Sequence, residues 1–193
     1  MAREGCTLLL LAFVACLGSA QTKYADPDSP AVSTAAHEAL SRAKVLDIVG
    51  VTSGIQGVLQ DLGAKVTDQE VRIDLASDVL FDFDKYTLRP EAAATLRKVG
   101  QVAASYPRST MIIEGYTDGK GTHPYNMKLS ADRAASVKIW LVQNAGIPSP
   151  RISTRGWGET KPVAPNKKAD GSDDPVGRQK NRRVEIVLRK VSA

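Results

Sequence analysis

Hydrophobic and polar residues alternate clearly in two segments of this 193-residue chain. Val71, Ile73 and Leu75 alternate with polar or small residues, and the same period returns at residues 184–188 near the end of the chain. A period of two is typical of a strand that buries one face. The pattern therefore predicts strands in both segments, each with one face in the core.

Two segments between these strands carry apolar residues at helical spacing. Pro90 opens the first helix at a position that favours proline. Pro124 begins the second helix, which we expect to reach about Asn144, with Gly146 as its stop. The residues of the first helix that should face the core are Ala92, Leu96, Val99 and Ala103.

Three further extended stretches are expected, at residues 79–83, 110–116 and 151–156. Residues 161–177 contain prolines and glycines and should form a long polar loop. The order of strand, helix, strand, helix, strand and strand predicts an α+β fold. Because strand–helix–strand crossovers are normally right-handed, we expect a small mixed sheet with helices packed on one face.

The N-terminal segment is typical of an export signal. Residues 7–17 are apolar, but a membrane-spanning helix needs ~20 such residues. We expect residues 1–20 to be a signal peptide that is cleaved after Ala20. An alternative stays open, because Cys16 directly ends the apolar run as in a lipoprotein processing site. A lipid on Cys16 would anchor the protein to a membrane, whereas cleavage after Ala20 would release it.

Residues 21–69 are expected to be a linker with a helical segment, which precedes a domain over residues 70–193. Residues 31–47 are rich in alanine and favour a helix. Residues 50–65 carry four glycines, and both a short helix and a hairpin are compatible with them.

Composition narrows the possible chemistry. The formal net charge of +5 suits an anionic partner but does not distinguish nucleic acid, lipid headgroups and wall polymer. The two cysteines, Cys6 and Cys16, lie in the N-terminal segment, which excludes thiol catalysis and cysteine zinc sites from the folded part. The only histidines, His37 and His123, lie far apart, so we expect neither a metal site nor a cofactor.

Two charged residues stand out as candidate ligand contacts. Arg133 lies at the edge of the apolar stripe of the second helix, and arginines are seldom buried without an anionic partner. That partner is either a ligand or an internal carboxylate. Asp118 follows the strand at 110–116, where glycines let the backbone turn sharply. The internal candidates to pair with Arg133 are Asp118, Glu114 and Asp132.

Several sequence blocks around these residues resemble the OmpA C-terminal domain family. The central blocks are Ile113–Asp118, Tyr125-Asn126 and Leu129–Ala134, and the flanking ones lie at residues 79–85, 151–152, 156–159 and 181–184. Ordered blocks over residues 71–188 are far more specific than one short motif. The resemblance implies an OmpA-like β-α-β-α-β-β sandwich over residues 70–193.

The resemblance also implies a function, the non-covalent binding of peptidoglycan at the diaminopimelate of its stem peptide. Asp118 matches the aspartate that meets the ligand's ammonium, and Arg133 matches the arginine that binds its carboxylate in bidentate fashion. The further residues that match the pocket or its rim are Asn126, Thr117, Leu129 and Asp84. Tyr116 departs from the family, since many relatives have histidine there.

The family resemblance places the protein in the bacterial cell envelope, in the periplasm or on the periplasmic face of the outer membrane. It would tether the envelope to the wall. An alternative is an envelope assembly factor whose main partner is a protein that binds residues 21–69. An enzyme is not expected, although Asp82 and Asp84 would share a strand face and, with Glu114, resemble a glycosidase carboxylate pair.

The basic run Asn181-Arg182-Arg183 also fits a nucleic-acid patch. We do not expect nucleic acid as a partner, because the chain carries an export signal and relatives have the same run at the start of their last strand.

Overall fold

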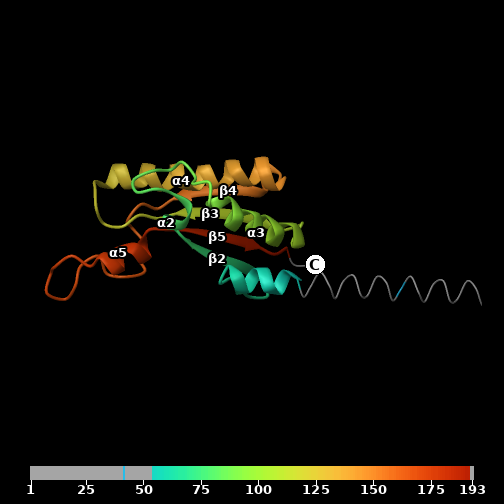
Figure 1. Ribbon diagram of the computed structural model, residues 1–193, viewed down its shortest axis with the longest axis horizontal. Coiled ribbons are helices and arrows are strands. Elements are labelled where there is room, and N and C mark those ends of the chain that lie inside the picture. The colour runs from blue at the N-terminus through green and yellow to red at the C-terminus, as the bar shows by residue number, and fades with distance from the viewer. Residues whose placement is uncertain (1–40, 42–53, 192–193) are drawn as a thin grey trace, which may run out of the picture. The chain divides into compact units, whose positions relative to one another are not determined.

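The computed structural model describes Ser41 and residues 54–191 of the chain (Figure 1). The predicted export signal and Cys16 lie outside the described residues, as does nearly all of the alanine-rich segment, where Ser41 alone is described and is helical. Within the described residues, no helix is both long and apolar enough to cross a membrane.

Five strands form one mixed sheet in the order β1-β2-β5-β3-β4. Strands β3 and β4 are parallel, and the other neighbours are antiparallel. The strands are β1 (Lys65–Val66), β2 (Glu70–Ala76), β3 (Thr110–Gly115), β4 (Ile152–Gly156) and β5 (Arg183–Arg189). The helices are residues 54–61, α2 (Ser77–Leu80), α3 (Ala92–Ser105), α4 (His123–Ala145), the 3-10 turn η1 (Ser149–Arg151) and α5 (Pro175–Asn181).

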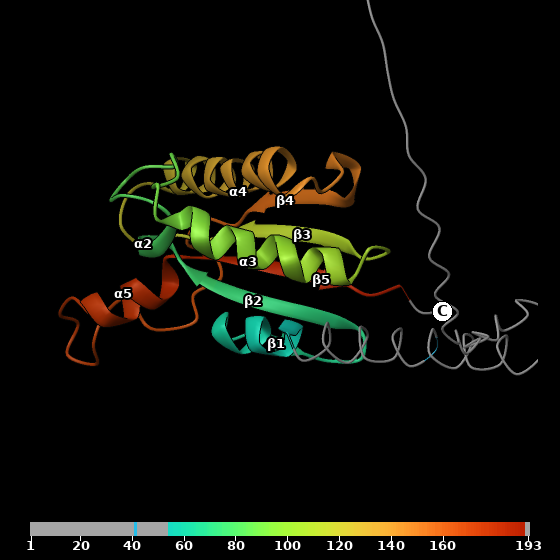
Figure 2. The same cartoon turned by 45° about the vertical axis from the view of Figure 1, so that its right-hand side comes forward.

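The long helices α3 and α4 lie along the same face of the sheet (Figure 2). Their apolar stripes meet the buried residues of β2, β5 and β3 in a single core. The four core positions predicted for α3 are all fully buried, and Val71, Ile73 and Leu75 of β2 are buried as their alternation predicts. Helix α4 ends at Gly146, whose φ of 65° is the left-handed conformation that suits glycine. The predicted α+β fold is therefore confirmed.

Three sequence predictions need correction or completion. Residues 79–83 do not form a strand, because α2 occupies Ser77–Leu80 and only Phe81 makes an isolated bridge, to Leu88. The predicted loop at 161–177 ends in a helix, since Asp174 caps α5 by accepting a hydrogen bond from the backbone of Gly177. Residues 54–61 are helical rather than a hairpin.

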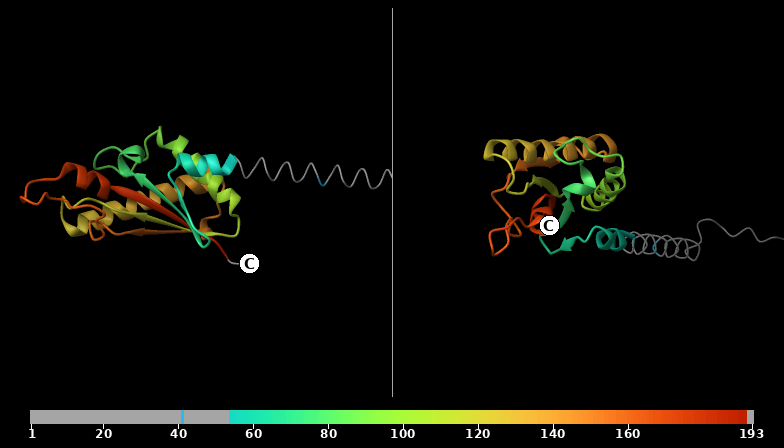
Figure 3. Two further views of the ribbon diagram at one scale, coloured as in Figure 1. Left: turned by 90° about the horizontal axis from the view of Figure 1, so that it is seen from below. Right: turned by 60° about the vertical axis from the view of Figure 1, so that its left-hand side comes forward.

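The segment before residue 70 contributes to the fold. Leu59 and Leu62 pack into the main core, and β1 pairs with β2 (Figure 3). The Nζ of Lys98 on α3 lies 2.8 Å from the carboxylate of Asp61. The compact structure therefore begins before the segment that resembles the OmpA domain.

Two glycines let α4 approach the ends of β3 and β4 closely. A Cβ atom at Gly115 would collide with the backbone carbonyl of Ser130, and one at Gly156 would collide with the backbone of Ala131. This approach brings the first half of α4 beside the loop that follows β3. The candidate ligand contacts on α4 and on that loop are thereby placed together.

Replacing Gly115 with alanine should destabilise the protein by about 1–3 kcal/mol, because the colliding atoms belong to backbone and cannot move aside cheaply. Urea unfolding measures this change. The matched control is Gly57→Ala, an exposed helical position with open space around it, where we expect a gain of about 0.5–1 kcal/mol. Equal unfolding midpoints for Gly115→Ala and wild type would contradict the close approach.

Candidate functional site

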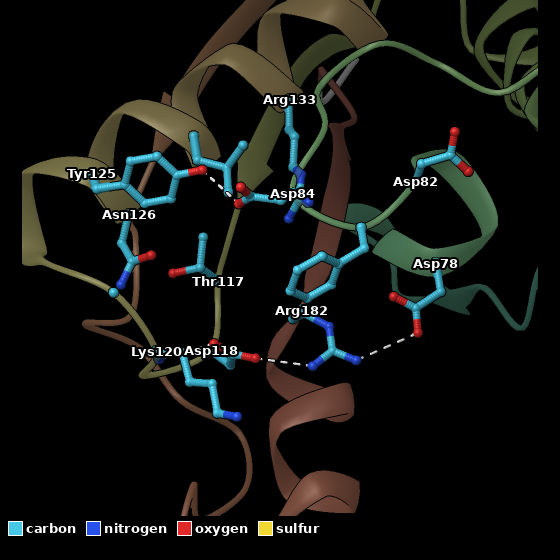
Figure 4. Close-up of a pocket in the computed structure, with 13 residues that line it drawn as sticks. Asp78, Asp82, Asp84, Thr117, Asp118, Lys120, Tyr125, Asn126, Arg133 and Arg182 are labelled. Atoms are coloured by element: carbon cyan, nitrogen blue, oxygen red, sulfur yellow. Dashed lines mark hydrogen bonds and ion pairs between the residues drawn. The ribbon is translucent and has the colours of Figure 1, made fainter.

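A cavity of about 200 Å³ opens where the segment after α2, the loop after β3 and the start of α4 meet (Figure 4). It brings together all six residues that the sequence predicted as ligand contacts: Asp118, Arg133, Asn126, Thr117, Leu129 and Asp84. The other residues that line it are Asp78, Asp82, Phe83, Lys120, Gly121, Tyr125 and Arg182. Four aspartates and three cationic side chains therefore share one small cavity.

Arg133 is buried, with 3% of its surface exposed, yet it has no ion pair among the described residues. Its Nε donates to the backbone oxygen of Lys85 at 2.9 Å, and its guanidinium lies 5.3 Å from the centre of the Phe81 ring. Burial lowers the pKa of Arg133; the charge of Asp84 opposes this effect and that of Arg182 adds to it. Its terminal Nη groups make no hydrogen bond among the described residues.

The proposed internal partners of Arg133 are wrong for this structure. The carboxylate of Asp132 lies 2.7 Å from Lys128. Glu114 accepts hydrogen bonds from Tyr116 and from the indole of Trp157. Asp118 pairs with other arginines instead.

Asp118 is held by a cluster of charges from the C-terminal part of the chain. Its Oδ2 lies 2.9 Å from Arg182 and 3.4 Å from Arg178, and its Oδ1 accepts the backbone N–H of Lys120 at 2.9 Å. Arg182 also reaches Asp78 at 3.6 Å, as Figure 4 shows. Asp118 is therefore a fixed carboxylate in the wall of the cavity, paired with two arginines.

Thr117, Asn126 and Leu129 are buried residues that line the cavity together with Asp118 and Arg133. All three are at least nine-tenths buried, and they come from the loop after β3 and from the first turns of α4. The Oγ1 of Thr117 is buried and has no hydrogen-bond partner among the described residues. A buried hydroxyl without a partner is costly, so it offers a polar contact to a ligand.

Asp84 has a backbone conformation that is unusual for a residue with a side chain. Its φ is 60°, which aspartate tolerates better than most residues. Its carboxylate accepts a hydrogen bond from the hydroxyl of Tyr125, and this bond raises the pKa of the tyrosine. Backbone strain of this kind is commonly found at binding sites.

Sequence reasoning did not identify the ion pairs that hold Asp118. Arg178 lies on α5, which the loop prediction overlooked, and its second partner is Asp173 at 2.6 Å. The pair Asp174-Pro175 is a helix-start signal that identifies α5 from sequence. The pairing itself has no local signal, because 60 or more residues separate Asp118 from both arginines.

Tyr116 does not line the cavity, although Thr117 and Asp118, which follow it in sequence, do. The guanidinium of Arg183 lies 3.7 Å from the centre of its ring, and its hydroxyl donates to Glu114. Burial, assisted by the charges of Glu185 and Glu114, raises the pKa of Tyr116. The departure from histidine at this position therefore changes packing rather than a cavity wall.

The carboxylates considered for catalysis are not arranged as the sequence predicted. Asp82 and Asp84 follow α2 in a turn and not in a strand, and Glu114 is absent from the cavity lining. His123 contacts Glu159 at 2.8 Å, and within residues 54–191 no three potential ligands gather as a metal site requires. His37 lies outside the described residues.

Comparisons with known proteins agree with the fold and with the sequence motifs. The model of the OmpA family matches residues 80–174. Outer membrane protein A of Bordetella avium is 45% identical over 131 residues, which are 68% of this chain and 64% of that protein. Outer-membrane lipoprotein YfiB of Pseudomonas aeruginosa is 35% identical over 139 residues, 72% of this chain and 79% of that one.

Two further matches bear names that refer to the cell wall. The peptidoglycan-associated lipoprotein of Rhizobium meliloti is 36% identical over 122 residues, 63% of this chain and 65% of that protein. The solved structure of the cell wall anchor of the T6SS from Pseudomonas aeruginosa aligns with a TM-score of 0.60 at 25% identity, covering 71% of this chain and 97% of that one.

This chain thus spans just under two thirds of the length of the Bordetella avium and Rhizobium meliloti proteins. It spans most of the length of lipoprotein YfiB. The relatives are outer-membrane and peptidoglycan-associated proteins, which confirms the predicted place in the bacterial cell envelope. By its fold, its ordered motifs and its relatives, the chain belongs to the OmpA family.

Proposed function

We propose that this protein binds peptidoglycan without a covalent bond, through the cavity between α2, α4 and the loop after β3, and so tethers the envelope to the wall. The observation that carries the proposal is Arg133, a buried guanidinium whose Nη groups have no partner in the described residues. The names of the peptidoglycan-associated relative and of the cell wall anchor support the same ligand.

The ligand that fits this cavity is the side-chain end of diaminopimelate, which carries an ammonium and a carboxylate on one carbon. The planar fork of Arg133 suits the carboxylate in bidentate fashion. Burial lowers the pKa of Arg133 and repulsion from Arg182 adds to this effect, so a carboxylate that enters near both cations relieves that repulsion. Thr117 adds a hydroxyl without a partner of its own.

The ammonium of the ligand requires an anionic contact. A carboxylate offers about four acceptor positions, and Asp118 uses three of them for Arg178, Arg182 and Lys120. One position stays open for the ammonium. The carboxylates of Asp78, Asp82 and Asp84 line the same cavity and also favour a cation there.

Co-sedimentation with purified sacculi of the diaminopimelate type tests the proposal. We expect the protein to sediment with the wall and to be released by high salt, because salt weakens contacts between charges. We also expect the wall to be recovered undigested, since the proposed role includes no catalytic step. Protein that stays in the supernatant with wall in excess would refute the proposal.

A further inference from the structure

A second cavity, of about 260 Å³, adjoins the first beside the start of α4. Its lining residues are Asp84, Tyr86, Tyr125, Lys128, Leu129 and Asp132, and we refer to it as the tyrosine groove. Asp84, Tyr125 and Leu129 line both cavities. The bond from Tyr125 to Asp84 therefore stands at their shared boundary, and one extended ligand can occupy both.

Exposed aromatic side chains gather around these two cavities. Among the described residues, the exposed large aromatics are Phe83, Tyr86 and Tyr125, with 86%, 53% and 45% of their surfaces accessible. Phe83 lines the first cavity, Tyr86 lines the tyrosine groove and Tyr125 lines both. Aromatic rings normally contribute buried area, so a cluster of exposed rings at one site indicates a binding surface.

The groove combines ring faces with polar groups at its edges. Lys128 and Asp132 form an ion pair of 2.7 Å, with 75% of the lysine side chain exposed. A pyranose sugar has the complementary character, with an apolar C–H face and a rim of hydroxyl and acetamido groups. We propose that the tyrosine groove binds a sugar ring of the glycan strand, the ring to which the stem peptide is attached.

This inference rests on the proposed function, because the stem peptide in the first cavity determines where its sugar lies. Diaminopimelate is the third residue of the stem, so its own side chain and two further residues separate the group bound in the first cavity from the sugar. Two extended residues span about 7 Å, and the side chain adds to this length. The stem is therefore long enough to join two adjoining cavities that share three lining residues. The groove would then distinguish a peptide on its glycan from a free peptide.

The test is calorimetric titration of the protein with two soluble ligands, the free stem tripeptide and the same tripeptide on its disaccharide. We expect wild type to bind the glycosylated ligand roughly 2- to 10-fold more tightly, the gain expected of an aromatic contact. Tyr86→Ala should abolish this gain and leave the affinity for the free peptide unchanged. Tyr86 is half exposed and makes no side-chain hydrogen bond among the described residues, so the variant should fold.

The control variant is Ile139→Ala, which removes an exposed side chain of α4 outside both cavities and should change neither affinity. The inference is overturned if the sugar adds nothing in wild type. It is also overturned if Tyr86→Ala weakens both ligands equally, which would assign the groove to the peptide. Binding of the free peptide without a sugar gain would leave the proposed function intact. Binding that requires the sugar, with no affinity for the free peptide, would refute the stem-peptide assignment on which the inference rests.

Discussion

Replacing Arg133 with alanine should remove retention on diaminopimelate-type wall, at a cost of about 2–5 kcal/mol in binding free energy. The cause is the loss of the single buried guanidinium whose Nη groups have no partner within residues 54–191. Arg133→Lys should recover little binding, because an ammonium keeps the charge but lacks the planar fork that matches a carboxylate. Co-sedimentation with sacculi measures both variants.

A suitable control is Arg155→Ala. Arg155 also lies over an aromatic ring, 3.7 Å from the centre of Trp157, but it is exposed and does not line the cavity. We expect Arg155→Ala to bind the wall as strongly as wild type does. Retention of Arg133→Ala at the wild-type level, with the fold intact by circular dichroism, would remove Arg133 from the site.

Asp118→Ala should lower the free energy of unfolding by about 3 kcal/mol, in addition to any effect on wall binding. The reason is that Asp118 faces two arginines in a largely buried cluster and accepts the N–H of Lys120 in the adjacent turn. In this variant Arg178 and Arg182 would each retain one other carboxylate partner. We therefore expect the loss of stability to lie at the lower end of the range for broken buried ion pairs. Urea unfolding gives the value.

Asp173→Asn is the matched control for this cluster. Asp173 pairs with the same arginine, Arg178, but half of its side chain is exposed. Exposed ion pairs contribute about 0.2–1 kcal/mol, so this variant should be nearly as stable as wild type. If Asp118→Ala and Asp173→Asn unfold at the same urea concentration, burial does not strengthen the Asp118 cluster. Asp118 is expected both to stabilise the fold and to contact the ligand. Lost binding by Asp118→Ala therefore identifies a ligand contact only when the stability of the variant is measured as well.

The elements that the sequence predicted best are those with a long, regular pattern. The alternation at Val71, Ile73 and Leu75 predicted β2, and helical spacing predicted α3 and α4 with their core faces. Short elements were missed, because the single turn of α2 is too brief for any period to appear. In β5 the alternation predicted that only one face is buried. Arg183 and Glu185 of the other face are buried as well, because they form an ion pair with each other.

The sequence predicted which residues form the candidate site, but not the ion pairs and hydrogen bonds that hold them. Arg133 drew attention because an arginine beside an apolar stripe needs an anion, and Asp118 because it follows a strand at a glycine turn. The family motif supplied the other four residues. The partners of Asp118 were not predictable, because α5 and the start of β5 reach it only through the fold. The strained backbone of Asp84 and the groove beside Tyr86 likewise depend on tertiary packing.

The central claim is that the cavity binds the second carboxylate of diaminopimelate through Arg133. The most direct measurement is calorimetric titration of wild type with two soluble stem peptides that differ only at the third residue, diaminopimelate or lysine. Lysine keeps the ammonium but lacks that carboxylate, whose charged hydrogen bonds contribute about 1.5–3 kcal/mol. We therefore predict at least roughly tenfold tighter binding of the diaminopimelate peptide. Equal affinities for the two peptides would contradict the claim.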